Sequence, residues 1–117
     1  MKTILLVVTT LFIMSCENID VKKPANLISE DQMVEILYDV VLINSAKGVN
    51  KQVLQRSIKN PHEYIYKKHN IDSLQFAESN AYYTFKNEVY KSIYEKLELK
   101  LTAQKTIYEA LNKEKLR

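Results

Sequence analysis

The sequence is poor in the residues that form tight turns, because its 117 residues include one glycine and two prolines. A sheet of several strands needs many turns, and turns depend on Gly, Pro and Asn. Hydrophobic residues make up 46% of the chain and charged residues 26%, which is typical of a globular domain rather than a disordered chain. We therefore expect a single all-α domain, a small bundle of three to four helices with a long C-terminal helix.

Cysteine is also scarce, and the single Cys16 follows an apolar run at residues 4–14. This run is too short to span a bilayer but suits a secretion signal. It ends in the letters IMSC at residues 13–16, which resemble the lipobox of bacterial lipoproteins, whose cysteine receives a diacylglycerol group. We expect residues 1–15 to be a cleaved signal peptide and Cys16 to be lipidated. The alternative is a cytosolic protein with a buried N-terminal helix and an incidental cysteine.

Several signatures of catalysis are lacking. The chain has no Gly-rich phosphate loop, no Cys/His metal pattern and no nucleophile elbow, and a lipidated Cys16 is not available as a nucleophile. The net charge of +3 is small and the lysines are spread along the chain, so we do not expect nucleic acid as a partner. These observations predict a protein that is not an enzyme and needs no cofactor.

Capping signals divide the rest of the chain into helices. Three predicted starts pair a capping residue with Gln or Glu three positions later; the pairs are Ser29 with Gln32, Asn60 with Glu63, and Asp72 with Gln75. Apolar residues follow at helical spacing. We expect helices at 30–47, with Gly48 as C-cap, at 61–69, ending at Asn70, at 73–85 and at 87–114. Residues 49–60 suit either a helix or an ordered loop.

Two segments flank this helical pattern. Residues 16–26 are polar and lack periodicity, which predicts a flexible lipidated tether ahead of a helical domain at 27–117. At the other end, the last helix is about 13 Å longer than the first, at 1.5 Å per residue. Its apolar stripe continues into this extra length with Leu101, Tyr108 and Leu111, interrupted by Gln104. We expect the stripe to contact a partner or a second copy, unless residues 49–60 fold back to cover it.

Five segments of the chain resemble a known family. The matching segments are residues 23–28, 33–39, 66–76, 79–83 and 90–94. They resemble an uncharacterised family of small lipoproteins of Bacteroidetes-type bacteria, known as a domain of unknown function. The resemblance implies a helical envelope lipoprotein and assigns no catalytic or binding residue. This chain has His69 and Asn70 where the family tends to have an aromatic residue and a glycine.

Two groups of charged residues are candidates for ion binding. Asp31, Glu35 and Asp39 recur every four residues and share one helix face, where their charges repel one another. We expect a solvated face or salt bridges to lysines of a neighbouring helix; a divalent-ion site and a surface for a basic partner are the alternatives. The second group is His62, Glu63, His69 and Asp72. Its two histidines lie about 10 Å apart along a helix, so we expect surface and capping roles and no metal site.

Tyrosine is the abundant aromatic residue, with eight in the chain. Most are expected at the edge of the core, where the ring is buried and the hydroxyl finds a partner. Adjacent helical residues point about 100° apart, so Tyr82 and Tyr83 do not both face inward unless the helix is covered on both sides. With Asn80 beside them, they are a candidate surface for a peptide or glycan.

These expectations favour a lipid-anchored adaptor that binds another envelope protein and has the capacity to self-associate. The alternative is a module that binds peptide, glycan or lipid through its tyrosines. A concave pocket beside Tyr82 or Tyr83 would favour the second function. The residues after Cys16 lack a compact acidic cluster, so we expect anchoring in the outer membrane on its periplasmic face rather than at the cell surface.

Overall fold

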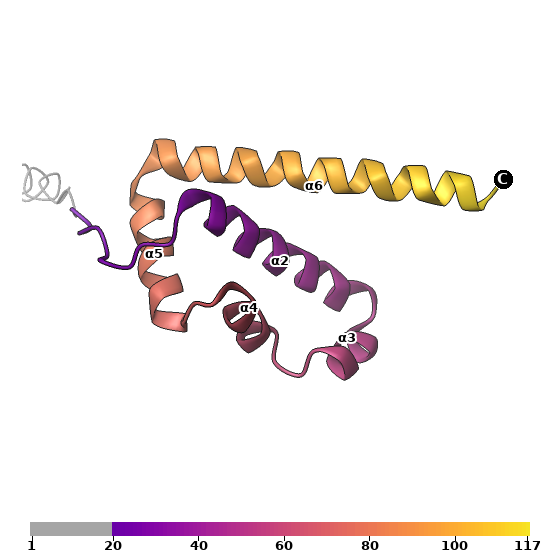
Figure 1. The fold of residues 1–117 in the computed structure, drawn as a ribbon, viewed down its shortest axis with the longest axis horizontal. Helices are drawn as coiled ribbons and strands as arrows, with labels where there is room; N and C mark the ends of the chain where they lie inside the picture. Colours follow the sequence, from indigo (N-terminus) through magenta and orange to yellow (C-terminus); the bar gives the residue numbers. More distant parts are fainter. Residues whose placement is uncertain (1–19) are drawn as a thin grey trace, which may run out of the picture.

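A computed structural model describes residues 20–117 of the chain, and this part is all-α (Figure 1). Its five helices are α2 (Glu30–Val49), α3 (Lys51–Ser57), α4 (Pro61–His69), α5 (Ser73–Phe85) and α6 (Asn87–Lys115). α2 packs against α3, α4 and α6, and α5 packs against α6. The all-α prediction and the long last helix are confirmed, and residues 51–57 supply a helix where the pattern also allowed a loop. The predicted signal peptide at 1–15 and Cys16 lie outside the described residues.

Three of the predicted helix starts have the expected side-chain caps. Ser29, Asn60 and Asp72 each accept a hydrogen bond from the backbone N–H three residues later. Asn70 ends α4 in the left-handed region, with φ of 53°. Asparagine tolerates this conformation better than other residues with a side chain, so the chain turns here as it would at a glycine.

The predicted end of the first helix is wrong. Gly48 has no positive φ and lies within α2, which continues to Val49. Asn50 ends α2 by donating its backbone N–H to the Ala46 carbonyl, and its side chain accepts from the Val53 N–H to begin α3. One asparagine therefore serves both helices, and no left-handed glycine is needed.

The glutamines at two helix starts do not complete the expected capping boxes. Gln32 donates its side-chain amide to the carbonyl of His69 at the end of α4, over 3.0 Å. Gln75 donates to the carbonyl of Asn26, over 2.9 Å. Each glutamine thus joins its helix to a distant segment instead of reaching back to its own cap. The second bond also attaches the end of the predicted flexible tether to α5, so residue 26 is held by the domain.

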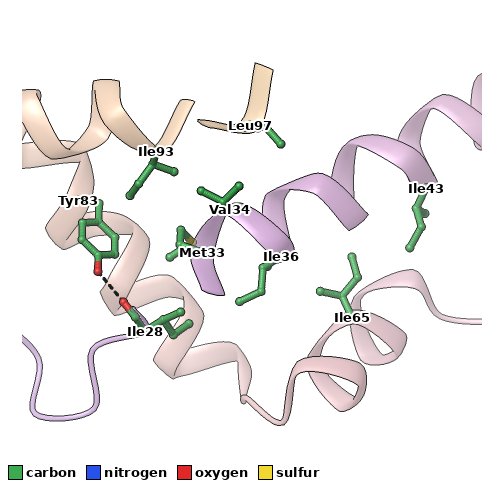
Figure 2. Close-up of a cluster of buried hydrophobic side chains, with 9 residues drawn as sticks. All are labelled: Ile28, Met33, Val34, Ile36, Ile43, Ile65, Tyr83, Ile93 and Leu97. Carbon is green, nitrogen blue, oxygen red and sulfur yellow. Dashed lines mark hydrogen bonds between the residues drawn. The ribbon is translucent and has the colours of Figure 1, made fainter. Parts of the chain in front are cut away.

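The core lies where α2, α4, α5 and α6 converge (Figure 2). Its apolar residues come from all four helices and from the chain just before α2; they are Ile28, Met33, Val34, Ile36, Ile43, Ile65, Tyr83, Ile93 and Leu97. Four of these nine residues lie on α2, more than on any other helix, so α2 is the central helix of the bundle. The core contacts α6 only through the first half of that helix, so the second half extends beyond it (Figure 1).

Candidate functional site

Two carboxylates of α2 are paired with lysines of α6. Lys96 lies 2.8 Å from Asp31, and Lys100 forms an ion pair with Glu35. The ammonium of Lys100 also lies 4.6 Å from the centre of the Tyr38 ring, a cation–π distance. The two lysines have the same four-residue spacing as the two acids, so the two ion pairs lie one helical turn apart along the contact between α2 and α6. This spacing is visible in the sequence and was not used in the prediction.

The third carboxylate, Asp39, is buried between α2 and α4. The Lys68 ammonium lies 2.9 Å from Oδ1 and 2.8 Å from Oδ2 of Asp39. The Nε2 atom of His69 lies 2.6 Å from Oδ2. Burial acts to raise the pKa of Asp39, but the hydrogen bonds and charges of Lys68 and His69 together outweigh it and lower that pKa below its ordinary value. The expectation of salt bridges to neighbouring helices is therefore confirmed for all three acids, and each of these carboxylates has a cation of this chain within reach.

The second group of charged residues is dispersed. His69 is bonded to Asp39, Asp72 caps α5, and His62 lies beside the Tyr66 ring with centroids 6.4 Å apart. Within residues 20–117, no group of three or more His, Cys, Asp or Glu side chains is arranged to hold a metal ion.

Tyr83 lies inside the domain, contrary to its assignment to a recognition surface. Its side chain is 5% exposed, and its hydroxyl donates a 2.6 Å hydrogen bond to the carbonyl of Ile28 (Figure 2). Buried Ser79, one turn earlier on α5, accepts from the N–H of the same residue at 3.0 Å. Burial raises the pKa of the Tyr83 hydroxyl. The pair fixes the chain where it enters α2, because both backbone polar groups of Ile28 are satisfied from α5.

Tyr82 is half-buried and borders an open hollow of about 520 Å³ between α5 and the chain before α2. Lys23, Pro24 and Val89 also line this hollow, and the ammonium of Lys86 lies 5.6 Å from the Tyr82 ring centre. Asn80 is half-buried and is not among the lining residues. Of the three residues assigned to this surface, Tyr82 and the buried Tyr83 line the hollow, and Tyr82 is the more exposed of the two.

The last part of α6 lies outside the bundle. We call residues 102–115 the α6 overhang; all are exposed except half-buried Asn112. Tyr108 is 64% and Leu111 56% exposed, while Leu101, at the boundary, is half-buried. α2 diverges from α6 towards this end, and α3 lies away from it (Figure 1). Residues 49–60 therefore do not cover the stripe, and the alternative in which they fold back is wrong.

Comparisons with known proteins bear on the family but not on an activity. No curated protein and no solved structure matches the chain. Within the described residues, no helix has both the length and the apolar character needed to cross a membrane. A family model does match residues 24–107, from the segment before α2 into the α6 overhang, and its description is a domain of unknown function. Since this match covers most of the chain, the protein belongs to the family DUF4296.

Proposed function

We propose that this protein is a lipid-anchored, non-catalytic interaction module of the cell envelope that binds its partner through the α6 overhang. The observation that carries the proposal is the apolar stripe of half-buried Leu101 and exposed Tyr108 and Leu111, which extends the core-facing side of α6 beyond the bundle. Exposed apolar stripes on a rigid helix are typical of protein interfaces.

The first half of α6 supports such a role because it is fixed to the bundle. Ile93 and Leu97 are buried in the core, and the ion pairs of Lys96 and Lys100 join this half to α2. The overhang therefore projects at a defined angle, so a partner meets a preformed surface and little ordering entropy is lost on binding.

The membrane anchor is supported by the sequence at residues 1–16. Intact-mass analysis of the protein purified from native membranes tests this part. We expect a species that begins at Cys16 and carries the mass of acyl chains, and Cys16→Ala should leave a precursor that retains residues 1–15. An unmodified chain that begins at Met1 would contradict the anchor.

The interaction itself is tested by substitution within the overhang. Tyr108→Ala with Leu111→Ala should abolish co-purification of the membrane partner. The matched control is Thr106→Ala with Lys113→Ala, which changes the opposite face of the same helix and should leave binding intact. Equal recovery of the partner with both double variants would contradict the proposal.

The hollow beside Tyr82 supports a second candidate function, the binding of a peptide, glycan or lipid. Tyr82 offers a ring and Lys23 a cation to such a ligand. The hollow is open, and the hydroxyl of Tyr83 is already used within the chain, so we favour the overhang. Binding of envelope glycans or peptides that Tyr82→Ala abolishes and the overhang variants leave unchanged would reverse this preference.

A further inference from the structure

The spacing of the exposed stripe indicates what covers it. Leu101, Gln104, Tyr108 and Leu111 are separated by three, four and three residues, which is the seam spacing of a helix that packs against another helix. We propose that the partner on this seam is a second copy of the chain, whose α6 overhang packs antiparallel to the first. This inference rests on the proposed function and names the partner of the same surface.

The shape of the bundle restricts how far the two helices overlap. Core contacts cover α6 as far as Leu97, and Leu101 is already half-buried, so a second helix has access mainly to the residues that follow. The stripe residues 101–111 of two antiparallel α6 helices pair completely when the two-fold axis crosses the seam at the height of residue 106 along the helix. Leu101 then faces Leu111 of the second copy, and the polar break at Gln104 faces the hydroxyl end of Tyr108 of the second copy. The symmetry repeats each pair once, giving four consecutive layers.

Charge favours the antiparallel arrangement over the parallel one. In the antiparallel pair, the helix dipoles oppose each other, and Glu114 of the second copy approaches Lys100 at the edge of the seam, where Lys100 also pairs with Glu35 of its own chain. In a parallel pair, Lys115 would face its own copy within the seam and Lys100 would lie beside Lys105. The helix dipoles and the two Lys115 side chains therefore favour the antiparallel orientation over the parallel one.

Near the proposed axis, one contact is favourable and one is unfavourable. Ile107, which is 54% exposed, meets its own copy and becomes covered. The two Lys105 side chains also approach each other, but Glu109 lies within 3.9 Å of Lys105 on the same helix and offsets part of the repulsion. Residues 105 and 107 lie at similar angles on opposite sides of the stripe, so both contacts flank the seam, and the charges of the exposed lysines are screened by solvent.

Disulfide trapping in membranes tests both the partner and the orientation. Three single variants of the full chain are oxidised, with the wild type as the control for Cys16. Ile107→Cys should give a covalent dimer, because the axis brings residue 107 of each copy together. Leu111→Cys should not, since residues 111 of an antiparallel pair lie about 15 Å apart along the helix. Thr106→Cys, adjacent in sequence but on the opposite face, should also remain monomeric.

The other outcomes overturn the inference in distinguishable ways. A dimer with Leu111→Cys and none with Ile107→Cys would show a parallel pair. If no variant dimerises while Ile107→Cys forms a disulfide-linked adduct with a different protein, the second copy is wrong and the interaction function survives. If no variant dimerises and the Tyr108→Ala, Leu111→Ala protein retains its membrane partner, both the second copy and the overhang function are wrong.

Discussion

The two halves of α6 are continuous in backbone but differ in what holds them. The first half buries Ile93 and Leu97 and makes ion pairs with α2. The contacts found in the overhang are local to the helix, such as the Lys105–Glu109 pair and the hydrogen bond from the Thr106 hydroxyl to the Thr102 carbonyl. A short isolated helix is marginal in water, but elongation from an existing helix avoids the unfavourable nucleation step. Packing of the first half therefore maintains the overhang as a helix while its surface stays exposed.

The sharpest test of this difference makes the same substitution in both halves. Ile93→Ala removes a side chain that is 1% exposed and should lower the free energy of unfolding by about 2–5 kcal/mol, through lost burial and a residual cavity. Ile107→Ala, in the exposed overhang, should change it by no more than about 0.5 kcal/mol. Urea unfolding followed by far-UV circular dichroism measures both, and similar losses would mean that the overhang belongs to the core.

The ion pairs of α2 allow a second comparison, between a buried and an exposed carboxylate. Asp39→Asn removes the charge that Lys68 and His69 share and should lower the free energy of unfolding by about 1.5–3 kcal/mol. Asp31→Asn affects an exposed pair with Lys96 and should have a much smaller effect. The same urea titrations measure this difference, and a larger effect at Asp31 would contradict the assignment of Asp39 to the core of the α2–α4 contact.

The lowered pKa of Asp39 also predicts how stability depends on pH. A carboxyl whose pKa is lower in the folded protein than its ordinary value of 3.8 stabilises the fold fully above that value. This contribution is lost as the pH falls through the lowered pKa of the folded state, because protonation then removes the pairing with Lys68 and His69. Urea midpoints measured between pH 7 and pH 2 should fall less steeply in Asp39→Asn than in the wild type. Identical slopes would show that another carboxyl controls acid unfolding.

The contact that fixes Ile28 predicts a smaller effect. Tyr83→Phe removes the donor to the Ile28 carbonyl and keeps the ring, so the free energy of unfolding should fall by about 1 kcal/mol. Tyr82→Phe, at the neighbouring half-buried tyrosine, is the matched control and should change stability less. Thermal unfolding of both variants compares the two positions. A larger loss of stability in Tyr82→Phe would contradict the structural role assigned to the Tyr83 hydroxyl.

Local signals in the sequence predicted the helices more reliably than the contacts between them. The caps at Ser29, Asn60 and Asp72 depend on residues three positions away, so the sequence alone is sufficient to find them. The partners of Gln32 and Gln75 were missed because their acceptors are distant carbonyls that only the folded chain brings near.

The same limit explains the outcome for the candidate surfaces. The length difference between the first and last helices predicted the overhang, because helix length follows directly from residue number. The direction in which Tyr83 points was not predictable, since it depends on the position of Ile28 on another part of the chain.

Truncation after Ala103 is expected to have the smallest effect on stability and is the most direct test of the two roles assigned to α6. It removes Gln104 and everything that follows, including Tyr108 and Leu111, and leaves Ile93 and Leu97 in place. Because the removed residues make no contribution to the core in the described structure, the free energy of unfolding should stay within about 0.5 kcal/mol of the full-length value.

The same truncation should abolish association, because it removes most of the proposed seam. Sedimentation of the detergent-solubilised proteins over a range of concentrations measures this, with Ile107→Ala as the variant expected to weaken rather than abolish it. A stable monomer that no longer associates separates the folding half of α6 from the binding half. A truncated chain that loses cooperative unfolding would instead show that the overhang stabilises the bundle, and its apolar stripe would then need no partner.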